Sequence, residues 1–137
     1  MVLFVLLVLL TAAQPLPAKS KAAPALTSDY VAALGVANRF LDAWQTQDYE
    51  KGLLLLSATA KRQMPEEQLQ VYFSPHPAPE RACEIGRGKK LKDGRYSFPV
   101  NLMETASGQD HKPTHPRASH IIVIKAGKDD WVIDKLP

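Results

Sequence analysis

The feature that most constrains the fold is a change in the spacing of apolar residues near Glu80. Before Glu80, apolar residues recur every three or four positions, as on one face of a helix. After Glu80 they alternate with polar residues, as in a strand with one buried face. Because the helices precede the strands rather than alternate with them, the sequence predicts an α+β domain with segregated layers and an antiparallel sheet.

The helical half begins with a long amphipathic helix over residues 28–47, which Thr27 or Ser28 can cap. Shorter helices are predicted over residues 49–57, where Asp48 supplies the cap, over 58–64 and over 65–73. The four consecutive leucines at 53–56 predict that the second helix is buried on most sides. The stripe of the long helix consists of Tyr30, Leu34, Ala37, Phe40, Leu41 and Trp44.

About four strands are predicted after residue 80, over residues 81–91, 95–104, 118–125 and 131–137. Gly86 and Gly88 indicate a bend or bulge in the first strand. Pro99 has no N–H, so the second strand is expected at a sheet edge or to bulge there. The third strand is apolar on both faces from Ile121 to Ile124, which is typical of a central strand.

The N-terminus predicts export. Residues 1–13 form an apolar run of signal-peptide length, with the small residues Thr11 and Ala13 before a cleavage point at Gln14. The Pro- and Ala-rich residues 14–27 are typical of a flexible linker ahead of a domain at 28–137. The chain would then be periplasmic or secreted. No Lys or Arg precedes the run, so an uncleaved membrane anchor is the alternative.

The charge and the cysteine content restrict the classes of partner and chemistry that are expected. The net charge is only +3, and the densest basic cluster, Arg87 to Lys92, contains no aromatic residue that could stack on a base. This favours a solvated strand edge and argues against nucleic acid as a partner. Cys83 is the single cysteine of the chain, so no intramolecular disulfide can form. It is interpreted as a small buried hydrophobe, with a reactive thiol as the alternative.

Two stretches carry a resemblance to a known family. They are "FLDAW…DY", from Phe40 to Tyr49, and the final strand "G-x-x-x-W-x-I-D-x-L", from Gly127 to Leu136. Residues 28–137 resemble the nuclear transport factor 2-like superfamily, a cone-shaped, cystatin-like α+β fold that includes ketosteroid isomerases and many exported bacterial proteins. The resemblance implies a curved sheet around the helices and a conical cavity, and many members dimerise through the outer sheet face. No catalytic residue of the family maps onto this chain.

The cavity that the resemblance implies suggests a set of ligand-binding candidates. They are chiefly aromatic, and simple core packing is the competing interpretation for them. His120 is the one weak catalytic candidate, as a general base if its imidazole faces the cavity. Glu84 and Asp134 are further polar candidates for this cavity. The candidates are Phe40, Trp44, Tyr72, Tyr96, Phe98, His120 and Trp131.

The stretch "GQDHKPTHPRASH", residues 108–120, raises the question of a metal site. His111 and His115 are four residues apart, but Pro113 and Pro116 prevent the regular helix that would place them on one face. A solvated hairpin loop is the better interpretation, with no metal and no cofactor expected.

The leading functional hypothesis is an exported, non-catalytic domain that binds a small apolar molecule or an envelope protein. An isomerase- or hydratase-like enzyme using His120 or a cavity carboxylate is one alternative. A protein-interaction module, forming a homodimer through its sheet, is the other.

Overall fold

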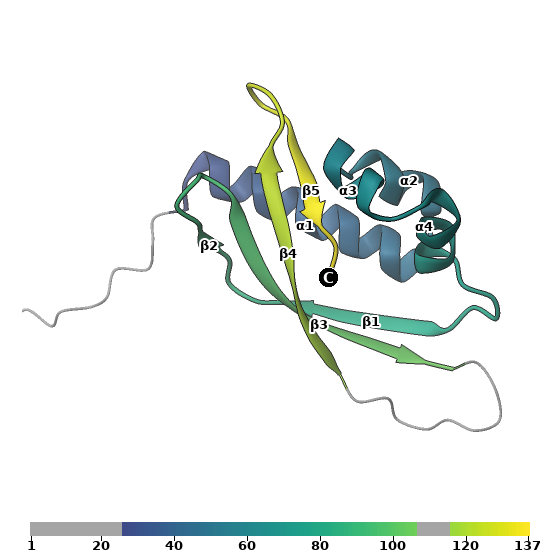
Figure 1. The fold of residues 1–137 in the computed structure, drawn as a ribbon. Coiled ribbons are helices and arrows are strands. Elements are labelled where there is room, and N and C mark those ends of the chain that lie inside the picture. Colours follow the sequence, from purple (N-terminus) through teal and green to yellow (C-terminus); the bar gives the residue numbers. More distant parts are fainter. Residues whose placement is uncertain (1–25, 107–115) are drawn as a thin grey trace, which may run out of the picture.

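The computed structural model describes residues 26–106 and 116–137. Within these residues, four helices precede a five-stranded antiparallel sheet (Figure 1). The predicted α+β class is confirmed, and the predicted signal segment and most of the histidine-containing loop lie outside the described residues. The elements are α1 (Ser28–Thr46), α2 (Tyr49–Leu54), α3 (Ala58–Gln63), α4 (Glu66–Phe73), β1 (Glu80–Ile85), β2 (Lys89–Lys90), β3 (Tyr96–Thr105), β4 (Arg117–Lys125) and β5 (Trp131–Lys135).

The helices begin where the sequence supplies an oxygen acceptor for a free backbone N–H. The Thr27 hydroxyl accepts from the Tyr30 N–H at 3.1 Å, and the Asp48 carboxylate accepts from the Lys51 N–H at 3.0 Å.

The expectation that the leucine run at 53–56 is buried on most sides is wrong. Helix α2 ends at Leu54, which is 80% exposed, and the chain then turns to pair with the sheet.

The sheet has the order β1-β3-β4-β5, with the short strand β2 also paired to β3. The first predicted strand is therefore two strands, separated at Gly86–Gly88, which confirms the predicted irregularity. At Gly88 the chain passes so close to Phe98 that an added Cβ would lie 2.3 Å from the Phe98 ring. A side chain at position 88 would overlap the Phe98 ring, so glycine is required for the two segments to lie this close.

Of the two alternatives predicted for Pro99, a sheet edge or a bulge, the edge is wrong, because β3 lies between β1 and β4. The pairing is irregular beside Pro99, since residues 86–88 stand opposite residues 98–99 between the pairs Ile85–Val100 and Lys89–Ser97. The Gly86 N–H donates to the Pro99 carbonyl at 2.8 Å. Since the N and C=O of one residue in an antiparallel strand face the same neighbour, the Pro99 nitrogen faces the interruption between β1 and β2. The missing N–H therefore removes no bond from the regular ladder.

Strand β4 is central, as predicted, and the outer side of β5 is covered by the residues that follow α2. The Ile133 N–H donates to the Leu55 carbonyl and the Ser57 N–H donates to the Ile133 carbonyl, each at 2.8 Å. The Ser57 hydroxyl also donates to the Asp134 carboxylate at 2.8 Å. Covering an edge in this way removes a surface that would otherwise pair with other chains.

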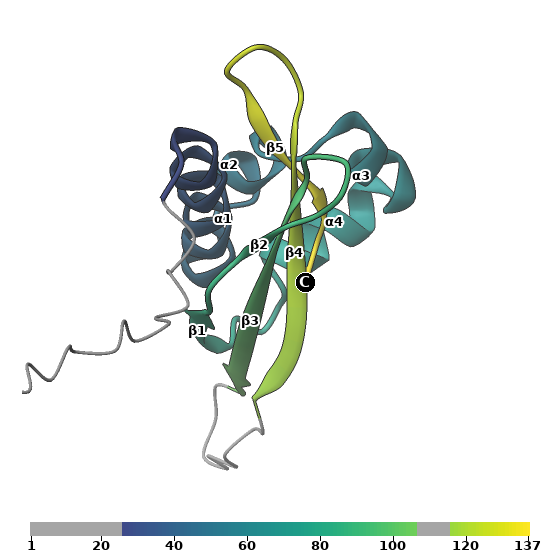
Figure 2. The ribbon, with the colours of Figure 1, turned by 90° about the vertical axis from the view of Figure 1, so that its left-hand side faces the viewer.

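The core lies between α1 and the sheet. Helix α1 contacts β1, β3, β4 and β5, and the sheet twists so strongly that β1 runs roughly along α1 while β4 crosses it steeply (Figures 1 and 2). Helices α2, α3 and α4 gather at the end of α1 that carries Thr46 (Figure 1). Across residues 26–106 and 116–137, no helix has both the length and the hydropathy needed to cross a membrane.

Arg81 connects the first strand to the ends of two helices. Its guanidinium donates to the Trp44 carbonyl at 2.7 Å, the Phe73 carbonyl at 2.8 Å and the Tyr72 carbonyl at 2.9 Å. The side chain is only 2% exposed, and its Cζ lies 4.5 Å from the centroid of the Trp44 ring. Burial lowers the pKa of the Arg81 guanidinium, while Glu104 and Tyr72 act in the opposite direction. Arginine remains charged under such shifts, so the helix carbonyls face a permanent cation.

Replacing this cation should destabilise the whole domain. We expect Arg81→Met to lower the free energy of unfolding by about 3 kcal/mol, because three carbonyls would lose charged donors in a buried place. Urea unfolding measures the change. The exposed Arg62 of α3 provides the control, and Arg62→Met should change the same free energy by less than about 0.5 kcal/mol. Equal effects of the two substitutions would contradict the role given to Arg81.

Replacing each of two glycines by alanine should change the free energy of unfolding in opposite directions. Gly88→Ala forces the Phe98 ring to move and should lower the free energy of unfolding by about 1–3 kcal/mol. Gly35 lies within α1 with no atom within 4 Å of an added Cβ, so Gly35→Ala should raise it by about 0.5–1 kcal/mol. Urea unfolding of both variants tests this, and a stabilised Gly88→Ala would show that the close approach at Phe98 is not required.

Candidate functional site

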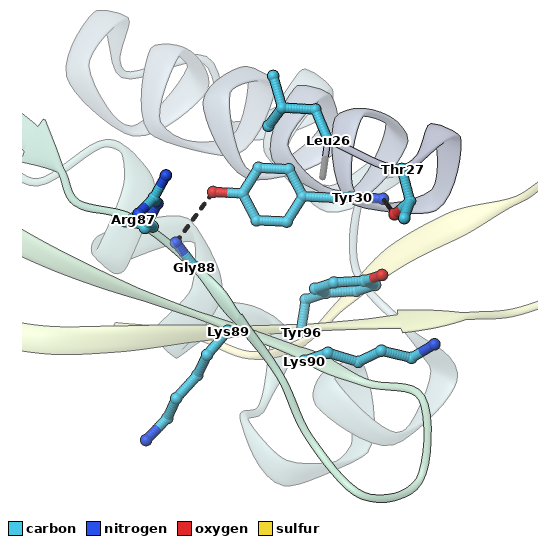
Figure 3. A pocket seen from close by; sticks show the side chains of 8 residues that line it. All are labelled: Leu26, Thr27, Tyr30, Arg87, Gly88, Lys89, Lys90 and Tyr96. Atoms are coloured by element: carbon cyan, nitrogen blue, oxygen red, sulfur yellow. Dashed lines mark hydrogen bonds between the residues drawn. The ribbon is translucent and has the colours of Figure 1, made fainter. Parts of the chain in front are cut away.

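A cavity of about 460 Å³ lies between the start of α1 and the chain segment around β2 (Figure 3). We call it the α1–β2 pocket. Its wall comes from segments far apart in the sequence, which the fold brings together at the end of α1 opposite to α2–α4 (Figure 1). The lining residues are Leu26, Thr27, Tyr30, Arg87, Gly88, Lys89, Lys90 and Tyr96.

Two tyrosines form the apolar part of this wall. The Tyr30 ring packs edge-on against Tyr96, with centroids 5.8 Å apart, and lies 5.6 Å from the ring of Phe98. The Gly88 N–H donates to the Tyr30 hydroxyl oxygen at 3.1 Å, which joins α1 to the segment before β2. Behind the pocket, Tyr96 packs edge-on against Trp131 at 5.6 Å. These contacts hold both rings in place, so the wall is preformed.

Three cationic side chains surround the pocket. Arg87, Lys89 and Lys90 are exposed, and none of them forms an ion pair with a carboxylate in the described part of the chain. The nearby carboxylates have other partners: Asp29 pairs with Lys125, and Asp93 pairs with Arg95. The pocket therefore combines an apolar wall with positive charge that forms no ion pair within the described residues.

The lining residues predicted from the sequence differ from those of this pocket. Phe40, Trp44 and Phe98 are at most 1% exposed and pack in the core, and Trp131 is 9% exposed. Tyr72 is half-buried on α4, and of the predicted candidates Tyr96 alone borders the α1–β2 pocket. The pocket residues of α1 and β2 were missed. The two glycines among basic residues at 86–90 were the available signal, because they mark a place where backbone and ring come close.

His120 is on the other side of the sheet from the helices, so the condition for its role as a general base, an imidazole that faces the cavity, is not met. Its side chain is exposed, whereas its neighbours Ile121 and Val123 in the alternating pattern of β4 are completely buried. It pairs with Pro99 and borders a hollow of about 300 Å³ on the outer face, together with Glu84 and Asn101. Without an interior imidazole, the general-base hypothesis loses its geometric basis.

The polar candidates Tyr72 and Asp134 have structural partners. The Tyr72 hydroxyl donates to the Pro137 carbonyl at 3.3 Å, and burial raises the pKa of Tyr72. Asp134 accepts from the Ser57 hydroxyl, which in turn caps α3 through the Ala60 N–H. Burial also raises the pKa of the Cys83 thiol, with Asp42 acting in the same direction, and a raised pKa leaves less of the reactive thiolate at neutral pH.

Most of the residues that suggest a metal site in the sequence lie outside the described part of the chain. Asp110, His111 and His115 are not among the described residues. In ranges 26–106 and 116–137, no three His, Cys, Asp or Glu side chains are grouped so that they could hold a metal ion.

Comparison with known proteins shows the fold alone. No family model matches the chain, and no curated protein matches it either. Among solved structures, an uncharacterized cystatin fold protein from Novosphingobium aromaticivorans is similar, with a TM-score of 0.54 at 12% identity, over 74% of this chain and 95% of that one. ActVI-ORFA from Streptomyces coelicolor gives a TM-score of 0.50 at 10% identity, over 78% of this chain and 92% of that one. These likenesses support the cone-shaped, cystatin-like fold and show no ligand or activity.

Proposed function

We propose that this chain is an exported, non-catalytic domain that binds a small apolar molecule in the α1–β2 pocket. The observation that supports the proposal is a preformed cavity of about 460 Å³ whose wall includes Leu26, Tyr30 and Tyr96. Small-molecule sites usually have volumes of roughly 300–1,000 Å³ and largely apolar walls, and this pocket fits both criteria.

The chemistry of the wall favours binding over catalysis. The described residues that line the pocket include no histidine and no carboxylate, so no side chain there is suited to act as a general base near neutral pH. The proposal of export is supported by the apolar run at residues 1–13, which has the length of a signal-peptide core. An envelope protein that carries an apolar side chain is the alternative occupant.

A test of ligand binding can use two exposed leucines as a matched pair. Leu26, 73% exposed, borders the pocket, whereas Leu54, 80% exposed, lies on α2. We expect the uncharged fluorescent probe N-phenyl-1-naphthylamine to bind, and Leu26→Ser to weaken its binding about 5- to 20-fold through lost apolar contact. Leu54→Ser should leave the dissociation constant unchanged. Fluorescence titration measures both.

The same titration contains the outcome that would contradict the proposal. If the probe shows no uptake, or if Leu26→Ser and Leu54→Ser weaken its binding equally, the α1–β2 pocket is not the binding site.

A second proposal, a homodimer formed through the outer sheet face, is favoured by a separate observation. Ile122, Ile124 and Val132 are only half-buried and alternate with the buried residues that face α1, so they form an apolar strip on the face away from the helices. Such a strip on a sheet gains stability when a second apolar face covers it.

Light scattering tests the homodimer. We expect Ile124→Lys to convert a dimer into a monomer, because a lysine on the strip would be desolvated at the interface. Val71 is 63% exposed on α4, so Val71→Lys is the control and should leave the molar mass unchanged. A wild-type chain that is monomeric at high concentration would contradict the proposal.

A further inference from the structure

We propose that the ligand of the α1–β2 pocket is an amphipathic carboxylate, an aliphatic chain or ring with one acidic head, and that Arg87 and the Tyr30 hydroxyl bind the head. The inference rests on the proposed function, since it specifies the chemical class that the same pocket takes. It is carried by the charge around the pocket, by a hydroxyl donor and by the exposed apolar rim.

The charge around the pocket is one-sided. Its lining contains Arg87, Lys89 and Lys90 and no acidic residue among those described. Asp29 and Asp93, which border a neighbouring hollow together with Lys90, pair with Lys125 and Arg95. This positive potential would attract an anionic group on the ligand, whereas it would contribute little to the binding of a neutral ligand.

The Tyr30 hydroxyl adds a donor at the same end of the pocket. Its oxygen accepts the Gly88 N–H at 3.1 Å, and its own O–H donates to no group in the described part of the chain. The Arg87 side chain and the Tyr30 side chain both line this pocket, and in the view of Figure 3 Arg87 is drawn next to the Tyr30 hydroxyl. A carboxylate placed there could accept from the hydroxyl and from the planar fork of the guanidinium together.

The apolar body of such a ligand also has a place to lie. Leu26 is 73% exposed at the rim, and the Tyr30 and Tyr96 rings form the wall below it (Figure 3). The stem of Lys90 extends beside Tyr96 in the same view, and the methylene groups of a lysine can cover an apolar surface while the ammonium stays in water. The lining therefore passes from cationic at Arg87 to apolar at Leu26.

The test compares two probes with the same apolar body, decanoate and decanol, as competitors of N-phenyl-1-naphthylamine at pH 8 and low salt. We expect decanoate to bind about 5- to 20-fold more tightly than decanol, and Arg87→Gln to weaken decanoate about 3- to 10-fold without changing decanol. Lys61→Gln, which removes an exposed positive charge on α3, is the matched control and should change neither. Added salt should reduce the preference for decanoate.

The outcomes separate this inference from the proposed function. If decanol and decanoate displace the probe equally, or if Arg87→Gln has no more effect on decanoate than Lys61→Gln, the carboxylate inference is overturned while the apolar pocket stands. If neither competitor binds and the probe itself is not taken up, the proposed function fails and the inference with it.

Discussion

The arrangement of helices on the sheet depends on one buried cation. Helices α1 and α4 both end without a basic residue in their last turn, so their terminal carbonyls have no local cation to offset the negative end of the helix dipole. Arg81 supplies that charge from β1, through hydrogen bonds to carbonyls of both helices. Because one guanidinium satisfies both ends, the helices and the strand must meet at one fixed geometry. A lysine could not reproduce this, since its three donors do not lie in a planar fork.

The two ends of α1 differ because this cation lies near only one of them. Around Arg81 the space between the helices and the sheet is filled by Trp44, Phe40 and Phe73, with the Phe40 and Phe73 rings packed edge-on at 5.6 Å. At the other end, β1 stops at Ile85 and the chain returns only as the two residues of β2. A single helix and a short strand cannot enclose the space there, so the Tyr30 and Tyr96 rings face an open pocket instead of a third layer.

Features that depend on residues close together in the sequence could be predicted. Features that depend on contacts between distant residues could not. The caps at Thr27 and Asp48 and the central position of β4 follow from residues within a few positions of each other. The position of Pro99 could not be judged without knowing that its neighbour strand is interrupted at Gly86. The face of β4 to which His120 belongs depends on which side the helices cover, and both sides of that strand carry isoleucine. The hydrogen bond from Ser57 to Asp134 joins residues 77 positions apart, and no spacing rule anticipates it.

Arg81 and Arg87 show why the same residue type stabilises the fold at one position and is available for recognition at another. Arg81 is 2% exposed, and the carbonyls around it accept from its two terminal nitrogens and fix its orientation. Arg87 lies within the interruption at Gly86–Gly88, where no helix carbonyl among the described residues accepts from it, and it remains exposed without an ion-pair partner in those residues. A cation that takes no part in the contacts of the fold stays hydrated at the surface. It can therefore replace part of its bound water with an anionic group of a ligand. The interruption at Gly86–Gly88 thus does two things at once: it opens the pocket beside Tyr30, and it releases a basic segment from the regular sheet to surround it.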